Sequence, residues 1–156
     1  MAKEHQYTAQ VTWTGNRGTG TSGYTAYDRD HLISANGKPD IFGSSDPAFR
    51  GNGNKYNPED SLVAALSACH MLWYLHLCSV NGIVVIDYVD KATGIMKENE
   101  DGSGQFSEVT LHPLITVESP AMAEKAKSLH EDANRMCFIA RSVNFPVRHQ
   151  PTITAS

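Results

Sequence analysis

The sequence predicts an α+β fold in which one long helix is surrounded by antiparallel strands. Strand-like segments precede this helix, two long strands joined by a turn follow it, and a second helix and a last strand complete the chain. Regular alternation of strand and helix, which produces a parallel sheet, is not seen. At 156 residues, the chain is expected to be a single domain over residues 1–156.

The N-terminal part predicts an antiparallel meander. Residues 7–13 alternate in polarity as a strand does, and a glycine-rich turn follows them. Residues 24–28 and 31–34 are predicted as two further short strands. Residues 35–57 are rich in Gly, Pro, Asn and Ser, so we expect a long irregular loop. Such a loop either borders a functional site or is a disordered connector.

The strongest helix prediction covers residues 58–80. Asn57 can cap the free amides, Pro58 loses no hydrogen bond there, and acidic residues favour the first turn. One stripe of this helix consists of Leu62, Leu66, Cys69, Trp73, His76 and Val80, and another side carries Val63, Met71, Tyr74 and Cys78. Because other sides are apolar as well, we expect a central helix surrounded by protein and not a membrane span.

Strands are predicted again beyond Gly82. Residues 83–87 form an apolar segment, and residues 88–97 and 105–118 are predicted as long strands joined by a hairpin turn at residues 98–104.

The remaining elements are a helix and an edge strand. The helix is expected from residue 121 to about residue 136, with Cys137 at its end. Residues 145–154 are predicted as a strand that Pro146 and Pro151 interrupt, and which is therefore expected at a sheet edge.

Composition excludes several classes of function. The net charge is −4 and no run of Lys or Arg occurs, so we expect no nucleic-acid partner. The N-terminus has no apolar stretch of the kind found in secretory signals. We therefore expect a cytoplasmic location and no membrane association. In a reducing compartment, three cysteines are free thiols or a transient redox pair.

Thiol chemistry is the function that the residue types favour. Cys69 taken alone is a packing residue, but a peroxidatic thiol needs a group that stabilises the thiolate and a second thiol that resolves the sulfenic acid. Cys137 can be that second thiol. Arg17, on the glycine-rich turn, can stabilise the thiolate, and Glu59 can hold an arginine through a bidentate pair.

Each of these residues also has a structural interpretation. Arg17 is a solvated turn residue and Glu59 a helix-dipole partner, and either Arg29 or Arg50 can replace Arg17 as the activating arginine. Cys78, nine residues after Cys69, points about 180° away and is assigned to packing.

No metal or cofactor site is predicted. The seven histidines lack the HExxH and i, i+4 patterns of metal ligands, and no phosphate-binding or dinucleotide motif occurs. Cys69 and His70 point about 100° apart on a helix and do not make a catalytic dyad. Residues 130–132, His-Glu-Asp, are expected on a solvated helix face.

Two segments resemble the OsmC/Ohr family. Residues 57–69, NPEDSLVAALSAC, resemble its NPE…(S/A)(A/G)C signature, and residues 123–137 are similar to its second-cysteine helix. The order of predicted elements also agrees over nearly the whole chain. One departure is that Cys137 is followed by Phe-Ile-Ala, where the family often has proline.

The resemblance implies an OsmC-like fold and an intertwined homodimer with active sites at the subunit interface. It implies a peroxidase for organic hydroperoxides or hydrogen peroxide, with Cys69 as peroxidatic and Cys137 as resolving cysteine. Glu59 matches the glutamate of the family's Arg–Glu pair, and Arg17 matches its arginine. No cofactor is implied beyond an external thiol reductant, either a dithiol or a thioredoxin-like protein.

A rival interpretation is a non-catalytic OsmC-like dimer that binds a small apolar ligand, with its cysteines buried for packing. Thiol reactivity discriminates between the two, because a peroxidase needs one thiol that reacts far below the ordinary thiol pKa of about 8.5.

Overall fold

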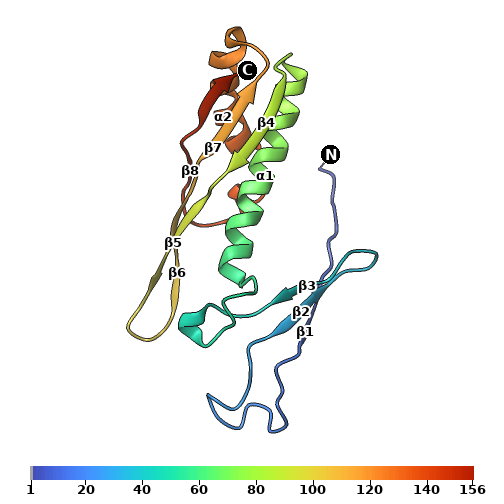
Figure 1. The fold of residues 1–156 in the computed structure, drawn as a ribbon, viewed down its shortest axis with the longest axis vertical. Helices are drawn as coiled ribbons and strands as arrows, with labels where there is room; N and C mark the ends of the chain where they lie inside the picture. The colour runs from blue at the N-terminus through green and yellow to red at the C-terminus, as the bar shows by residue number, and fades with distance from the viewer. Residues whose placement is uncertain (1) are drawn as a thin grey trace. The chain divides into compact units, whose positions relative to one another are not determined.

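A computed structural model describes residues 2–156 (Figure 1). The chain forms two compact units, one that ends at Ser61 and one that comprises Leu62–Ser156. The first unit holds a small sheet, and the second holds most of the long helix α1, two further sheets and the helix α2. The predicted α+β class is therefore confirmed.

The first unit contains a three-stranded antiparallel sheet. Its strands are β1 (Gln10–Trp13), β2 (His31–Ser34) and β3 (Ile41–Gly43), in the order β1-β2-β3. The predicted meander is thus confirmed, but the strand predicted at residues 24–28 is wrong, because that stretch consists of turns and bends. The third strand of the meander is β3 instead.

The side chain of Arg29 explains the missing strand. It donates to the carbonyl oxygens of Tyr24 (2.8 Å) and Tyr27 (2.6 Å), and Trp13 Nε1 donates to the carbonyl of Asp28 (2.8 Å). These side-chain hydrogen bonds compete with a ladder of backbone hydrogen bonds and stabilise the turns instead.

Residues 35–57, predicted as an irregular loop, are folded back on themselves. They contain β3 and a short 3₁₀ helix (Pro47–Phe49), and Gly43 forms a bridge with Tyr56. A Cβ atom on Gly51 would lie 1.5 Å from the carbonyl oxygen of Ser45. Only glycine permits this close approach, so the segment has a defined conformation.

Helix α1 (Pro58–Val80) has the predicted boundaries. Asn57 Oδ1 accepts from the Asp60 amide (2.7 Å), which satisfies one of the free donors of the first turn. At the other end, Gly82 adopts a left-handed φ of 70° and the Ile83 amide donates to the Cys78 carbonyl (2.9 Å). This is the Schellman pattern that ends helices at glycine.

The buried stripe of α1 differs from the predicted one. It consists of Leu66, His70, Tyr74 and Cys78. His76 and Val80 of the first predicted stripe are exposed, and His70 is buried, because an apolar pattern cannot indicate polar side chains that find partners inside the protein. Tyr74 Oη, for example, donates to the Ala126 carbonyl of α2 (3.0 Å).

Helix α1 is also long and apolar enough to cross a membrane, by length and composition alone. Core helices of soluble proteins meet the same criteria when they are mostly buried, whereas 22% of this stretch of α1 is buried in the single chain. One side of α1 packs in the core of its unit and another side is exposed. Tyr74 and Cys78 share a core cluster with residues of two other elements, which are Ile115 and Val117 of β7 and Ala126, Leu129 and Ala133 of α2.

Two mixed sheets complete the second unit. One has the order β4-β7-β9 and the other the order β5-β6-β8. The six strands are β4 (Val85–Asp90), β5 (Thr93–Glu98), β6 (Gly104–Leu111), β7 (Pro113–Val117), β8 (Val147–His149) and β9 (Thr152–Ala155). The last two pair in parallel with β6 and β7 at sheet edges, as predicted for the C-terminal strand.

Each long strand predicted in this unit is interrupted. Residues 88–97 divide between β4 and β5, and residues 105–118 divide at His112. Residues 145–154 divide at Gln150 and Pro151, so the interruption predicted at Pro151 is confirmed. Asp90, the last residue of β4, links the break between β4 and β5 to the break at His112 through its carboxylate. Its Oδ1 accepts from the His112 amide (2.7 Å), and its Oδ2 accepts from Ser67 Oγ of α1 (2.5 Å).

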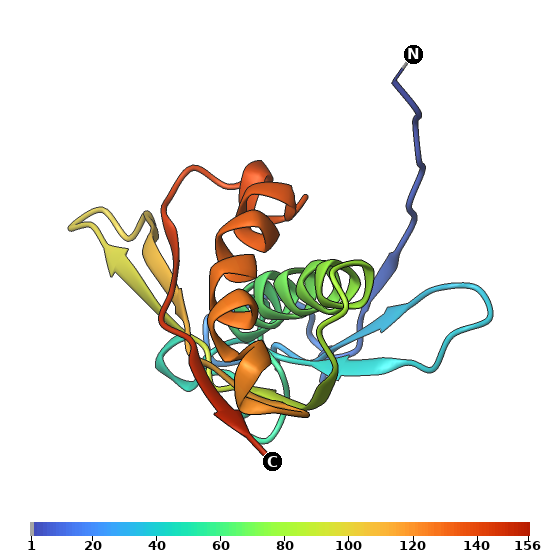
Figure 2. The same ribbon diagram turned by 90° about the horizontal axis from the view of Figure 1, so that it is seen from above.

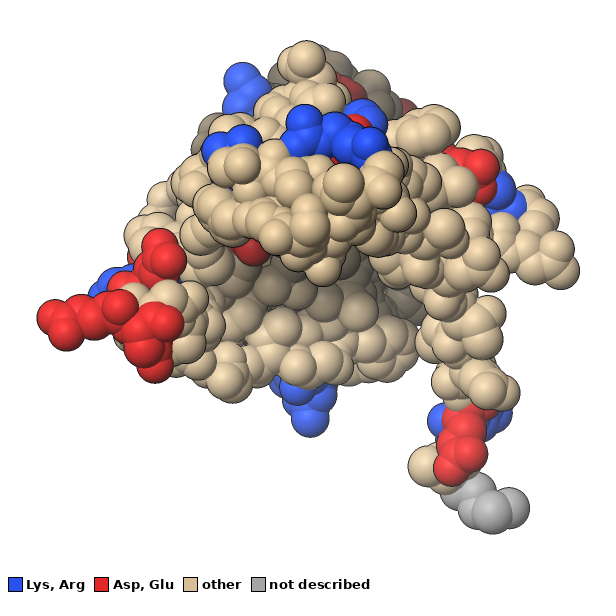
Figure 3. Space-filling model, turned by 90° about the horizontal axis from the view of Figure 1, so that it is seen from below, with Lys and Arg blue, Asp and Glu red and all other residues tan. Residues whose placement is uncertain are grey.

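Helix α2 (Ala123–Met136) follows a 3₁₀ turn (Pro120–Met122) and lies beside α1 (Figure 2). Its buried residues are Ala126, Leu129, His130 and Ala133. The hairpin that joins β5 and β6 carries exposed carboxylates at its tip, where Glu98, Glu100 and Asp101 lie (Figure 3). It is a solvated end of the molecule.

Candidate functional site

Cys69 and Cys137 are brought together by the packing of the two helices. Cys69 lies in the middle of α1 and is half-buried, whereas Cys137 follows the last residue of α2 and is only 1% exposed. Both are free thiols. Burial raises the pKa of the Cys137 thiol to about 11, the Ala140 amide opposes this shift, and the neighbouring Cys69 thiol adds to it. Cys137 is therefore protonated at neutral pH.

Cys137 itself ends α2. Its backbone is extended (φ −66°, ψ 113°), and a turn of two residues leads from it into a short 3₁₀ helix (Ala140–Ser142). The Ala140 amide points back and donates to Cys137 Sγ (3.4 Å). This turn gives the thiol a defined position without a proline after Cys137.

The third cysteine belongs to the core. Cys78 is 1% exposed and packs in the cluster formed by α1, β7 and α2. Burial raises the pKa of its thiol, and a hydrogen bond with Tyr74 opposes the shift. It lies about two and a half helical turns from Cys69 along α1, on the opposite side of the helix, so it fills space as its helical position suggested.

Arg17 and Glu59 are not paired with each other in the described part of the chain. Arg17 lies on the glycine-rich turn, where its side chain donates to the Thr25 carbonyl and lies 3.7 Å from Asp28 Oδ1. Glu59 is half-buried in the first turn of α1, and no ion pair involves it among residues 2–156. Ten residues separate Glu59 from Cys69, which corresponds to about 15 Å along the helix.

The two alternative arginines have different surroundings. Arg29 is engaged by backbone carbonyls, and its guanidinium stacks on the Tyr27 ring at 3.9 Å. Arg50 lies 5.7 Å from the Tyr24 ring and is the one described non-glycine residue with a positive φ, 64°. Both therefore have local structural roles in the first unit.

A shallow apolar recess lies on the same face of α1 as Cys69. It has a volume of about 270 Å³ and is lined by Leu72, Trp73 and His76. These residues follow Cys69 at i+3, i+4 and i+7, the spacing of one helix face. The ring of Phe138, the residue after Cys137, packs edge-on against Trp73 with 5.5 Å between centroids.

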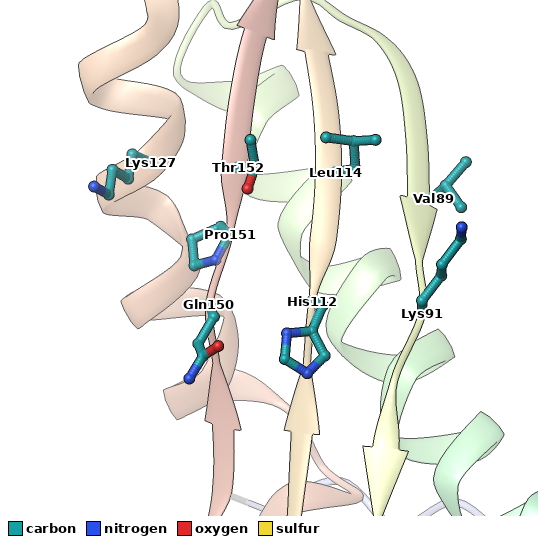
Figure 4. A pocket seen from close by; sticks show the side chains of 8 residues that line it. All are labelled: Val89, Lys91, His112, Leu114, Lys127, Gln150, Pro151 and Thr152. Carbon is teal, nitrogen blue, oxygen red and sulfur yellow. The ribbon is translucent and has the colours of Figure 1, made fainter.

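A larger groove of about 620 Å³ crosses the β4-β7-β9 sheet (Figure 4). Its lining combines apolar strand residues with Lys91, His112 and Lys127. Neither thiol lines this groove, and the side chains in it are spread over separate strands and α2. It is an open surface rather than a site with converging groups.

Three histidines, His70, His130 and His149, form a cluster that the sequence did not predict. His70 Nε2 and His130 Nδ1 are hydrogen-bonded at 3.0 Å, and the His149 ring lies 5.7 Å from the His70 ring. The solvated face predicted at residues 130–132 is therefore wrong for His130, which is fully buried. The spacing of four residues between Ala126 and His130 places both on one face of α2, and this spacing could have indicated that His130 is buried.

The described residues contain no group of three or more side chains placed to hold a metal ion.

Comparison with known proteins gives the family. A family model for OsmC-like proteins matches residues 51–152. A comparison with curated proteins found no match. Among solved structures, an OsmC-like protein of unknown function from Vibrio cholerae is 28% identical, with a TM-score of 0.86 and alignment over 96% of this chain and 100% of that one.

Two other solved structures carry functional names. An organic hydroperoxide resistance protein from Elizabethkingia anophelis is 22% identical, with a TM-score of 0.69 over 99% of this chain and 100% of that one. One from Bacillus subtilis is 20% identical, with a TM-score of 0.59 over 95% and 98%. At these identities the similarity demonstrates a common fold. Together with the family match over most of the sequence, it shows that this chain belongs to the family of OsmC-like proteins.

Proposed function

We propose that the protein reduces hydroperoxides, with Cys69 as the attacking thiolate and Cys137 as the resolving thiol. The observation that carries this proposal is the proximity of a half-buried thiol in mid-helix, Cys69, to a buried thiol at the end of the neighbouring helix, Cys137. The names of several structural neighbours, organic hydroperoxide resistance proteins, support the same chemistry.

The reaction balances with an external dithiol as the electron donor. The Cys69 thiolate attacks one peroxide oxygen, the O–O bond breaks, and the departing alkoxide takes up a proton to leave as an alcohol. The resulting sulfenic acid is then attacked by the Cys137 sulfur, which forms the disulfide and releases water. A dithiol or a thioredoxin-like protein reduces the disulfide by thiol exchange.

The different environments of the two thiols agree with this division of roles. Cys137, with its raised pKa and its hydrogen bond from Ala140, is kept as an unreactive thiol until Cys69 is oxidised beside it. Cys69 is the more accessible of the two. A nucleophile that meets substrate needs this exposure, and a resolving thiol does not.

The recess beside Cys69 supports an organic peroxide as substrate. Its lining is apolar and aromatic, and Phe138 extends it toward Cys137. An alkyl or aryl group that packs there would leave the peroxide oxygens near the thiol. We therefore place organic hydroperoxides ahead of hydrogen peroxide as substrates.

Activation of Cys69 is assigned to Arg17 and Glu59 of a second copy of the chain. Glu59 of the same chain is about 15 Å from Cys69 along α1, so one guanidinium anchored there does not reach the thiol easily. A homodimer in which a second chain supplies the Arg17–Glu59 pair avoids this problem. The exposed apolar face of α1, with Leu72 63% and Val80 64% exposed, is consistent with such a partner.

Binding of an apolar ligand without catalysis is the second candidate, because the same recess could hold one. Peroxide turnover decides between the candidates. The reduced protein is mixed with cumene hydroperoxide and dihydrolipoamide, and peroxide loss is followed for wild type and Cys69→Ser. Turnover by wild type and its loss in the variant support the peroxidase. Equal, background-level rates for both proteins would favour the ligand-binding function.

A further inference from the structure

The buried histidine pair forms a polar contact at the centre of the α1–α2 interface. His70 is 1% exposed and His130 is fully buried, and their rings are nearly parallel, with 5° between planes. The hydrogen bond between His70 Nε2 and His130 Nδ1 (3.0 Å) is the one described side-chain hydrogen bond that joins the two helices through side chains alone. The pair therefore fixes how α2 lies against α1.

The hydrogen bond couples the protonation states of the two rings. One nitrogen must carry the proton and the other must accept it, so both rings are neutral or share one extra proton. The outer nitrogens, His70 Nδ1 and His130 Nε2, are buried without a described partner. Breaking the inner bond would leave two more buried polar atoms unsatisfied, which makes any other arrangement of the helices costly.

The thiol pair lies next along the same interface. Tyr74 contacts Ala126 and His70 contacts His130, so moving back along α1 corresponds to moving forward along α2. Farther along α2, just past its last residue, Cys137 lies close enough to Cys69 for the Cys69 thiol to raise the pKa of Cys137. Cys69 is directly adjacent to His70, and Cys137 follows His130 by seven residues, two turns on the same helix face.

We propose that His70 and His130 are positioning residues for the Cys69–Cys137 pair. By locking the rotation and register of α2 on α1, their hydrogen bond holds the resolving thiol within reach of the attacking one. This inference rests on the proposed function, since it gives the pair a role in disulfide formation. Purely apolar contacts at this interface are non-directional and would hold the register less strictly.

The test measures how readily the two thiols form a disulfide, without any peroxide. Protein is equilibrated with glutathione and its disulfide, and the Cys69–Cys137 disulfide is quantified by mass spectrometry. The equilibrium gives the effective concentration of one thiol at the other. His130→Leu should lower this concentration about tenfold or more, because it leaves His70 unpaired and frees the register.

Two further variants separate positioning from stability. In the His70→Gln/His130→Asn double variant, the glutamine amide can donate to the asparagine oxygen and replace the bond, so the effective concentration should return to within about threefold of wild type. Leu129→Ala removes buried apolar contacts one residue away and keeps the histidine bond. It should lower the melting temperature as His130→Leu does, with little effect on the disulfide equilibrium.

The outcomes are distinct. If Leu129→Ala and His130→Leu weaken the disulfide equally at equal loss of melting temperature, or the double variant fails to restore it, the inference is overturned and the histidines only stabilise the fold. If wild type forms no Cys69–Cys137 disulfide at any glutathione ratio, the proposed resolving role of Cys137 is overturned together with the inference. If His130→Leu shifts the disulfide equilibrium but the wild type does not turn over peroxide, the positioning role of the histidines is supported and only the proposed peroxidase function is contradicted.

Discussion

The ring of Tyr74 stacks on the ring of His130 with 3.9 Å between centroids and 10° between planes. This stacking places a polar side chain of α2 against the central helix, where an apolar pattern would expect only hydrocarbon. Burial raises the pKa of Tyr74 well above its usual range, so its hydroxyl stays a donor, and it donates to the Ala126 carbonyl. The α1–α2 interface is thus built from directional contacts as well as apolar ones.

Oxidation is expected to join Cys69 and Cys137 and no other pair. After one equivalent of cumene hydroperoxide, peptide mass mapping of wild type should find this disulfide. Cys137→Ser should instead accumulate sulfinic and sulfonic forms of Cys69, because nothing resolves its sulfenic acid. Cys78→Ser is the control and should behave as wild type. A disulfide that includes Cys78 would contradict the assignment of that residue to the core.

The stability of the fold is expected to fall in mild acid. Burial lowers the pKa of His70 to about 4 and of His130 to about 3, with His149 acting on both. The unfolded chain takes up protons near pH 6.5 while the folded chain does not, so the stabilisation is complete above pH 6.5 and is lost as pH falls toward 4. From pH 7.5 to pH 5, each buried histidine should cost about 2 kcal/mol.

Urea unfolding at the two pH values measures this loss. Two other titratable groups contact the pair, Tyr74 on α1 and His149 on β8. Behind them, Cys78 on α1 and Tyr88 on β4 lie beside Tyr74, and Glu131 on α2 lies beside His149. The His70→Gln/His130→Asn variant isolates the contribution of the pair. Its free energy of unfolding should differ much less between pH 7.5 and pH 5 than that of the wild type. An equal pH dependence in wild type and variant would assign the effect to other groups.

Asp90 is expected to contribute to stability through its two hydrogen bonds. Asp90→Ala leaves the His112 amide and the Ser67 hydroxyl without their acceptor, which should lower the free energy of unfolding by about 1–3 kcal/mol. Asp90→Asn keeps one oxygen acceptor and should lose less. Urea unfolding at pH 7.5 compares the three proteins. Equal stability of wild type and Asp90→Ala would show that the strand breaks are maintained by other contacts.

Local chemistry made some elements predictable. The limits of α1 follow from Asn57, Pro58 and Gly82, all of which act within a few residues, and the sequence therefore predicted both ends. The breaks in the long strands depend on Asp90 reaching His112 and Ser67 across the fold. Such contacts between distant residues leave no periodic pattern, so the sequence predicted continuous strands.

The candidate site was predictable to a similar degree. The family signature around Cys69 and the helix before Cys137 indicated the two thiols, and the packing of α2 on α1 brings them together. The buried histidines were missed because their burial depends on a partner 60 residues away. The pairing of Arg17 and Glu59 remains a prediction, since it involves a second chain.

A homodimer is expected from the uncovered side of α1. Only 22% of its apolar stretch is buried in the single chain, and Phe138 beside it is 67% exposed. An interface of more than ~2,000 Å², typical of obligate dimers, would cover this surface. Sedimentation at micromolar concentration should give a dimer for wild type, and Val80→Glu, which buries a charge in the interface, should weaken it. A monomeric wild type would contradict this prediction.

Arg17 and Glu59 are expected to activate Cys69 together. A guanidinium near a thiolate favours the charged form, and it does so best when a carboxylate holds it in place. Arg17→Ala should therefore slow Cys69 alkylation by iodoacetamide at pH 7 by about tenfold, which corresponds to one pKa unit. Arg17→Lys should recover only part of the rate, because an ammonium keeps the charge and loses the bidentate fork. Glu59→Ala should slow the alkylation of Cys69 as well.

Asp28 provides the control that makes this test decisive. It is the carboxylate that Arg17 contacts within the described chain, at 3.7 Å. If Arg17 acts by leaving Asp28 for Glu59, Asp28→Asn should leave alkylation and single-turnover peroxide reduction at wild-type rates or raise them. If Arg17 only braces its own turn, Asp28→Asn should instead reproduce the defect of Arg17→Ala. Should Arg17→Ala change neither rate, Arg29 or Arg50 becomes the candidate activator, and an unactivated Cys69 would favour the ligand-binding function.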